Sequence, residues 1–482
     1  MKLDVMVTGG IVRGSVEAGL AVFRGIPYAA SPVRFGAPQP VQTWDGVREA
    51  SSFGPPPPQS TALGARADAE GGEDWLSINV WSADLGGGLP VMVWIQGGAY
   101  VFGWSGLPEY DGGNLARGGV VVVTFNYRVG LEGFGYVEGT PANRGLLDQV
   151  AALAWVQENI RAFGGDPGRV TVFGQSAGGG SVAALLAMPR ATGLFRRAIV
   201  QSMPGTYFTP ALAADITRVC AAQLGLEPGD LPTVDPHRLP AAGDAVMAVM
   251  DQYVARWGRA AHARVPFAPV VDGDVLPSTP WEGLTGHGEL LVGHTRHEQR
   301  LLTALAGLLG AVTPGQATEA AQVFGPDPRR YEETFPDAQE LYEVVRSDWL
   351  FRMPSLKLAD AQVKAGGPAY LYELTWPAPG MGGVLGACHG LDVPLVFGNL
   401  TAGQPAVLLG EPTPEAHSLS EQMRTAWTAF ATTGSPGWAA YDTGSTRIFD
   451  RDPAVTAYPE TVSAEIWRNH PTVLDLEGER TS

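Results

Sequence analysis

The chain has 482 residues, of which 45% are hydrophobic, and it carries a formal net charge of -17 at pH 7. This acidic balance argues against nucleic acid or an anionic membrane surface as a partner, because both attract basic protein surfaces. The hydrophobic fraction is sufficient for a large core, and no low-complexity linker divides the chain. The sequence therefore predicts a single domain spanning residues 1–482.

Cysteine usage and the N-terminal residues bear on the cellular compartment. The chain contains only two cysteines, Cys220 and Cys388, which favours a reducing compartment over a disulfide framework. Residues 1–5 lack the apolar stretch of a signal peptide, and no window is long and apolar enough to span a membrane. We expect a cytoplasmic protein that is a monomer or a small homo-oligomer.

Apolar runs that alternate with helical patterns indicate the fold class. Residues 91–95 and 120–125 are continuous and rich in β-branched side chains, which is typical of strands covered on both faces. Further strands are predicted at residues 169–173, 197–201, 289–293 and 369–374. Between these runs, residues 145–160 carry apolar side chains at helical spacing. The alternation predicts an α/β fold with a mainly parallel central sheet and helices on both faces.

Two strand-poor segments follow elements of the predicted sheet. Residues 209–263 and residues 301–345 are mostly helical in pattern. We expect them to fold over the top of the sheet as cap-like insertions around a site, because ligands bind beyond the carboxyl ends of parallel strands.

The most informative motif is Gly174-Gln175-Ser176-Ala177-Gly178, which follows the predicted strand at residues 169–173. A strand that turns through Gly-x-Ser-x-Gly into a helix exposes the serine hydroxyl at the apex, and the glycines remove side chains that would collide. The free N–H groups of the helix N-terminus favour the negative charge of an acyl-transfer intermediate. Ser176 is the predicted nucleophile.

A serine hydroxyl needs a base, and His389 is the best candidate for that role. His389 lies in a glycine-rich loop between the predicted strand at residues 369–374 and the apolar run at residues 393–397. A loop after a late strand is where the base of such a fold belongs. We expect surface or packing roles for His237, His262, His287, His417 and His470.

The acid that orients the base should follow a strand between Ser176 and His389, and Glu298 fits this position. Asp272 and Asp274 are competitors, but Asp-Gly-Asp is more typical of a turn. His294, His297 and Glu298 could also be interpreted as metal ligands. The helical His-Glu-x-x-His spacing is absent and the segment resembles a loop, so we expect neither a metal nor another cofactor.

Acyl transfer also needs N–H donors for the developing oxyanion. The strand at residues 91–95 runs into Gln96-Gly97-Gly98-Ala99, a glycine turn whose amides can face the serine. The amides of Gly98, Ala99 and Ala177 are the predicted donors.

Longer motifs extend this pattern through most of the chain, at residues 23–29, 73–81, 143–149, 163–167 and 427–434. With the serine turn, they resemble the type-B carboxylesterase family of α/β hydrolases, which includes para-nitrobenzyl esterases and cholinesterases. The resemblance implies a serine carboxylesterase that forms an acyl-enzyme. It also implies the following residue roles: triad residues Ser176, Glu298 and His389, oxyanion donors Gly98, Ala99 and Ala177, and Ser202 as a support for the histidine.

Several positions depart from the family pattern. Gln175 replaces a frequent Glu before the nucleophile, which removes a charge near the histidine. The other departures are Gln96 for an aromatic residue or His, Trp75 for Cys, His297 and Gln299 for Asp and Gly beside the acid, and Asp392 for Glu in the histidine loop.

The expected partner is a small-molecule ester. Residues 59–73 contain no aromatic side chain for an ammonium cage, so choline esters are not expected. Small-to-medium or aromatic carboxylic esters fit better. The alternatives are a non-catalytic scaffold or adhesion protein, or an amidase, carbamate hydrolase or transacylase that uses the same triad. Retention of Ser176 and His389 disfavours the scaffold.

Overall fold

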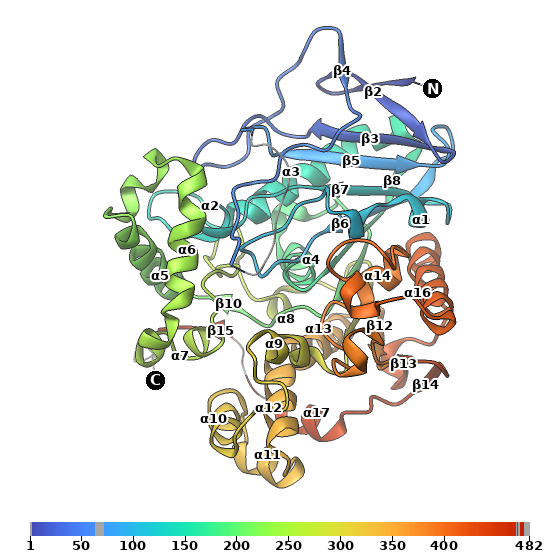
Figure 1. Cartoon of the computed structure of the whole chain (residues 1–482). Helices are drawn as coiled ribbons and strands as arrows, with labels where there is room; N and C mark the ends of the chain where they lie inside the picture. Colours follow the sequence, from blue (N-terminus) through green and yellow to red (C-terminus); the bar gives the residue numbers. More distant parts are fainter. Residues whose placement is uncertain (1, 63–71, 469, 471–472, 477–482) are drawn as a thin grey trace.

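A computed structural model of the chain describes residues 2–62, 72–468, 470 and 473–476 (Figure 1). The loop predicted to lack an ammonium cage, residues 59–73, falls largely outside the described residues. None of the helices within the described ranges has the length and apolar character needed to cross a membrane.

A large central sheet organises the molecule (Figure 1). Its central strands run parallel in the order β7 (Val121–Phe125), β6 (Leu89–Ile95), β8 (Gly165–Gln175), β9 (Arg197–Gln201), β11 (Glu289–Thr295), β12 (Ala369–Leu374) and β13 (Thr446–Phe449). The antiparallel edges contain β1 (Lys2–Val7), β2 (Gly10–Glu17), β3 (Leu20–Pro27) and β5 (Ser77–Ser82) on one side and β14 (Ala454–Thr456) on the other. The short β4 (Val47–Glu49) pairs with β2. The mainly parallel sheet predicted from the sequence is confirmed.

The central strands from β7 to β12 contribute side chains to two separate cores, because successive side chains point to opposite faces of a sheet. Val91, Val93 and Ile95 of β6 belong to one core, whereas Met92 and Trp94 belong to the other. The first core is completed by α3 (Arg144–Asn159), α4 (Ala177–Ala187) and α13 (Met353–Lys364). The second is completed by α1 (Gly113–Ala116), α14 (Asp392–Phe397) and α16 (Pro414–Thr433). Burial on both faces explains why these strands are continuous apolar runs.

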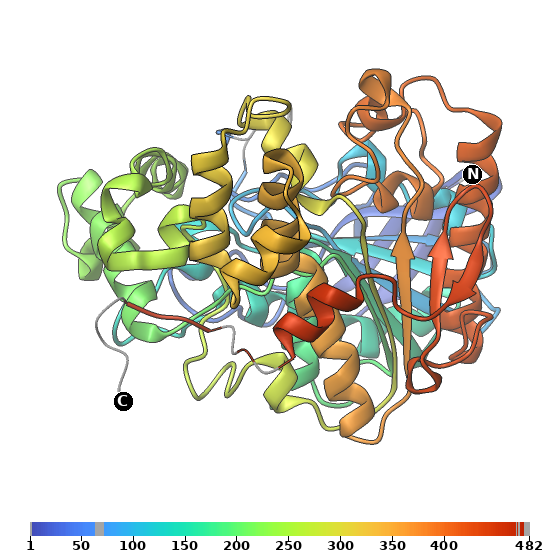
Figure 2. The same ribbon diagram turned by 90° about the horizontal axis from the view of Figure 1, so that it is seen from below.

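The two strand-poor segments are helical, as predicted. The first contains α5 (Pro210–Gln223), α6 (Leu239–Ala248) and α7 (Val254–His262), and the second contains α9 (Glu298–Leu305), α10 (Pro314–Phe324), α11 (Pro328–Thr334) and α12 (Ala338–Ser347). Figure 2 shows the two groups side by side, and the Arg259 side chain joins them by donating to the Val323 carbonyl oxygen at 2.8 Å. The second segment begins at Glu298. The prediction of a loop at Glu298 is therefore wrong, because this residue occupies the first turn of α9.

The fold brings several sequence-distant residues to one edge of the sheet. The neighbouring strands β8, β9, β11 and β12 are parallel, so their carboxyl ends lie at the same edge. Ser176 follows β8, Ser202 follows β9 and Glu298 lies just beyond β11, while His389 lies on the segment that leaves β12.

Candidate active site

The sharp turn after β8 holds Ser176 in a conformation that few residues other than glycine adopt. Ser176 has φ 57° and ψ -127° and immediately precedes α4. Such a backbone costs roughly 1–3 kcal/mol and is found mainly at functional sites. A Cβ atom on Gly174 would lie 2.6 Å from the backbone of Gly178, and one on Gly178 would lie 1.9 Å from the Ile95 carbonyl oxygen. The turn can close only because both positions are glycine, and it leaves the Ser176 side chain partly exposed.

Glu298 and His389 are joined directly. The Glu298 side chain is fully buried, and its Oε2 atom lies 2.5 Å from His389 Nδ1. Its other oxygen accepts the amide of Thr295 at 2.8 Å. Burial raises the pKa of the Glu298 carboxyl, but the charge and hydrogen bond of His389, with the charge of His294 and the Ser202 hydroxyl, together outweigh burial and hold that pKa below its usual value. An ionised Glu298 keeps the proton of neutral His389 on Nδ1 and leaves the lone pair on Nε2.

The His389 imidazole lies beside the serine turn, with 12% of its side chain exposed. Its Nε2 atom is 3.2 Å from Nε2 of Gln175, the residue before Ser176. Because Nε2 of Gln175 can only donate, it occupies the lone pair of His389 Nε2 in this structure. In the described part of the chain, no hydrogen bond joins the Ser176 hydroxyl to the imidazole. Phe351 packs on the imidazole with ring centroids 4.3 Å apart. No motif in the sequence predicts this role for Phe351.

The glycine turn after β6 lies against the serine. A Cβ atom on Gly97 would be 3.1 Å from the Ser176 Cβ. The turn has positive φ at Gly98 and Ala99, 122° and 52°, and the Gly98 carbonyl oxygen accepts the amide of Val101 at 2.9 Å. Among the described residues, the amides of Gly98, Ala99 and Ala177 donate to no protein acceptor. These three predicted donors are free to bind an anion.

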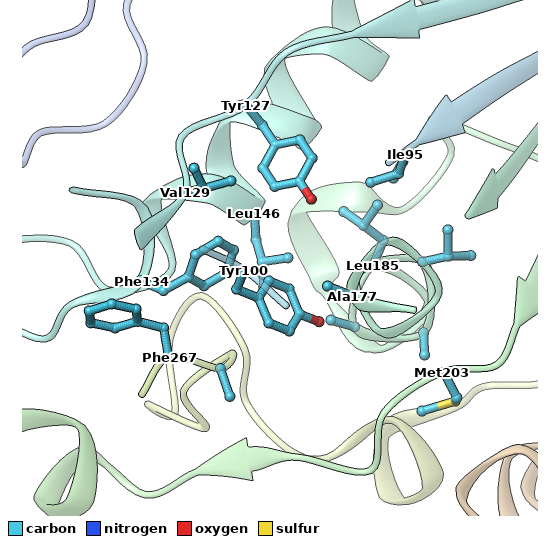
Figure 3. Close-up of a cluster of buried hydrophobic side chains, with 14 of the residues drawn as sticks. Ile95, Tyr100, Tyr127, Val129, Phe134, Leu146, Ala177, Leu185, Met203 and Phe267 are labelled. Carbon is cyan, nitrogen blue, oxygen red and sulfur yellow. The ribbon is translucent and has the colours of Figure 1, made fainter. Parts of the chain in front are cut away.

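Apolar packing supports this turn from behind. Figure 3 shows Tyr100 pointing toward the helix that begins at Ala177, with Val129, Phe134 and Phe267 nearby. The Tyr100 and Phe134 ring centroids are 4.6 Å apart. Tyr127 donates its hydroxyl to the Gln96 carbonyl oxygen at 2.6 Å. The turn is therefore supported by buried aromatic and aliphatic side chains and by the hydrogen bond from Tyr127.

Ser202 also takes a strained conformation at the site, with φ 47°. Its amide donates to the Gly293 carbonyl oxygen at 2.8 Å and so ties the end of β9 to β11. The Ser202 hydroxyl meets no acceptor with good hydrogen-bond geometry in the described ranges, but it contributes to lowering the pKa of Glu298.

The competing acids lie elsewhere. The Asp274 side chain is 76% exposed and pairs with Arg190 at 3.1 Å. Asp272 accepts the amide of Leu276 at 2.9 Å, in agreement with the turn predicted there. The histidines of the possible metal cluster have separate partners: His294 Nε2 lies 3.2 Å from the Tyr458 hydroxyl, and His297 Nδ1 accepts the amide of Ala387. No three His, Cys, Asp or Glu side chains gather as metal ligands within the described residues.

The buried His294 predicts a loss of stability in weak acid. Burial lowers its pKa from 6.5 to about 4. The unfolded chain therefore binds a proton that the folded chain resists, and stability is lost as pH falls from about 6.5 to about 4. The contribution is at most about 3 kcal/mol. Urea titrations at pH 7 and pH 5 should show that His294→Gln loses less free energy of unfolding than the wild type over this interval. An equal loss in the two proteins would contradict the prediction.

Comparison with known proteins identifies the family. A model of the carboxylesterase family matches residues 2–309 and 316–450. The chain is 37% identical over 478 residues to the para-nitrobenzyl esterase of Bacillus subtilis (strain 168), an alignment that covers 94% of this chain and 96% of that protein. It is 35% identical over 450 residues to the phenmedipham hydrolase of Pseudarthrobacter oxydans, covering 89% and 90% of the two chains.

Solved structures of esterases are also similar to this protein over nearly its whole length. A carboxylesterase of Geobacillus stearothermophilus is similar to this structure with a TM-score of 0.85 and 34% identity, and the match covers 96% of this chain and 99% of that one. A structure of a PNB esterase gives a TM-score of 0.84 at 34% identity over 97% of this chain and 99% of that one. The chain therefore belongs to the carboxylesterase family of α/β hydrolases, and it is a serine hydrolase of carboxylic esters.

Proposed function

We propose that Ser176, His389 and Glu298 are the catalytic residues of this esterase. The observation that carries the proposal is the 2.5 Å contact between Glu298 Oε2 and His389 Nδ1, located beside the strained serine turn. A buried carboxylate in this position fixes the imidazole tautomer and stabilises the imidazolium that forms during the reaction. The base then carries its lone pair on Nε2, the atom that lies 3.2 Å from the amide of Gln175, the residue before Ser176.

In the proposed reaction, the Ser176 oxygen attacks the ester carbonyl while His389 Nε2 accepts the hydroxyl proton. The Gln175 amide must leave the Nε2 lone pair for this transfer. The negative charge on the former carbonyl oxygen is stabilised by the amides of Gly98, Ala99 and Ala177. The imidazolium then protonates the departing alcohol. In the second half-reaction, His389 removes a proton from water, and the resulting hydroxide attacks the acyl carbonyl carbon. The bond from that carbon to the Ser176 oxygen then breaks, the imidazolium returns the proton to the Ser176 oxygen, and the acid is released.

We further propose small-to-medium or aromatic carboxylic esters as substrates, with the two helical segments at residues 209–263 and 301–345 acting as a cap on one domain. A recess beyond the glycine turn has apolar side chains such as Val101, Leu239 and Phe267 in its lining, together with the carboxylates of Glu132 and Asp244. This lining favours an uncharged group over an anionic one, although the recess includes none of the proposed catalytic residues. Two relatives, the para-nitrobenzyl esterase and the phenmedipham hydrolase, are named for small organic substrates, which also favours this class.

Reaction with a para-nitrophenyl alkylphosphonate tests the nucleophile. Attack by Ser176 should release about one equivalent of para-nitrophenol per chain and leave a stable adduct, because the phosphonyl group mimics the tetrahedral intermediate. Peptide mapping by mass spectrometry should find the adduct on Ser176. An adduct on another residue, or activity toward para-nitrophenyl acetate that persists without any adduct, would refute the assignment.

A further inference from the structure

We propose that His297 is a positioning residue for the ester hydrolysis, acting as a clip that holds the loop of His389 against the segment of Glu298. This inference rests on the proposed catalytic roles of Glu298 and His389. In the family that the chain resembles, Asp is usual at the position of His297, so the imidazole acceptor at this position is a feature of this chain's own sequence.

The clip consists of two hydrogen bonds between His297 and Ala387. The His297 amide donates to the Ala387 carbonyl oxygen at 2.9 Å, and the Ala387 amide donates to His297 Nδ1 at 3.1 Å. His297 directly precedes Glu298, and Ala387 lies two residues before His389. The two bonds of the clip and the Glu298–His389 bond therefore close a small ring that links acid and base. Movement of the loop that breaks the clip also moves the imidazole.

The loop is shaped to receive the His297 ring. Gly386 has φ 57°, and a Cβ atom there would lie 2.7 Å from His297 Nδ1 and 3.1 Å from Arg300 Nη1. A side chain at position 386 would displace the imidazole from the loop. The carbonyl oxygen of Gly386 accepts the amide of Ala378 at 2.9 Å, which anchors the loop at the same point. Before this anchor the loop is open to solvent, with Met381 60% exposed and Val384 50% exposed.

The clip works only if His297 Nδ1 carries no proton, because the atom accepts the Ala387 amide. The surroundings enforce this state. Burial, followed by the positive charges of Arg300, Arg296 and Arg352, lowers the pKa of His297 to about 4, against the opposing charge of Glu460. Arg300 is itself held by Glu343 at 2.8 Å. His297 is therefore a neutral acceptor at pH 7. A residue that replaces it preserves the clip only if its side chain offers an uncharged acceptor to the Ala387 amide.

The test compares His297→Asn with His297→Leu. Asparagine offers an uncharged oxygen at nearly the same distance from the backbone as Nδ1, whereas leucine has similar bulk and no acceptor. We expect the leucine variant to lose about 10- to 100-fold in kcat with KM changed less than about threefold, because a small displacement of a catalytic group has this effect. The asparagine variant should keep kcat within about threefold of the wild type. Thermal unfolding of both variants should be recorded in parallel.

Two results would overturn the proposal: full kcat in the leucine variant, or equal losses in the two variants. If the leucine variant does not fold, His297→Ser replaces it, because its short hydroxyl cannot reach the Ala387 amide and the same loss of kcat is expected. Phosphonate labelling of the wild type separates this test from the proposed function. If the wild type labels at Ser176 and the variants do not follow the expected order, only the clip is refuted.

Discussion

Ser176→Ala is expected to lower kcat by at least about 1000-fold while the protein stays folded. Without the hydroxyl no acyl-enzyme forms, and only the oxyanion donors and substrate binding remain to assist water. The structure adds a reason for the fold to survive. The Ser176 backbone is held by its own amide, which donates to the Gln201 carbonyl oxygen at 3.0 Å, and alanine keeps this bond. Steady-state hydrolysis of para-nitrophenyl acetate measures the loss.

A suitable control is Ser418→Ala, which removes an exposed hydroxyl from α16, far along the chain from the site. This variant should keep the activity of the wild type. The phosphonate should label Ser418→Ala at Ser176 and should give no adduct with Ser176→Ala. Retention of more than about a tenth of the wild-type kcat by Ser176→Ala would assign the nucleophile to another residue.

Glu298→Gln is expected to lower kcat by about 1000- to 10,000-fold with a small change in KM. The reason lies in the two hydrogen bonds of the carboxylate, which accepts from Thr295 at 2.8 Å and from His389 at 2.5 Å. A glutamine has only one acceptor oxygen. Its NH2 group must face either the Thr295 amide or His389 Nδ1, and in the second case the imidazole is held in the wrong tautomer.

Asp274→Asn provides the matched control, because it neutralises the competing carboxylate without changing its size. Asp274 is exposed and pairs with Arg190, so the substitution should leave kcat unchanged. Thermal unfolding of both variants separates loss of catalysis from loss of the fold. If Asp274→Asn severely lowered kcat and Glu298→Gln kept the wild-type kcat, the role of the acid would pass from Glu298 to Asp274.

The strands that the sequence predicted best are those buried on both faces. Residues 197–201 and 369–374 coincide with β9 and β12, because their apolar side chains are short runs that favour a strand over a longer helix. No strand was predicted before residue 91. In β2, side chains alternate between buried and more exposed positions, and the fully buried β5 contains polar residues. Asn79 of β5 is satisfied by the amide of Gly25 at 2.9 Å, a contact that local sequence does not reveal.

The residues of the site also differ in whether a local sequence pattern reveals them. Ser176 and the glycine turn carry local motifs, because strained turns require glycine at fixed positions. Phe351 has no such motif, since it reaches His389 only through the packing of a distant helical segment. The helix at Glu298 did carry a local signal. An acidic residue opens the helix, and Leu301 and Leu305 follow at helical spacing. The helical pattern predicted from residue 301 therefore begins three residues earlier in the structure.

The order of the strands in the sheet has a consequence for biosynthesis. The nucleophile turn belongs to the first half of the chain, but the Glu298–His389 contact requires the strand β12 and the segment that follows it. A nascent polypeptide on the ribosome thus carries Ser176 long before His389, the proposed base, has been translated. Esterolysis should emerge only when synthesis is nearly complete, so truncated products that escape the ribosome would be inert toward cellular esters.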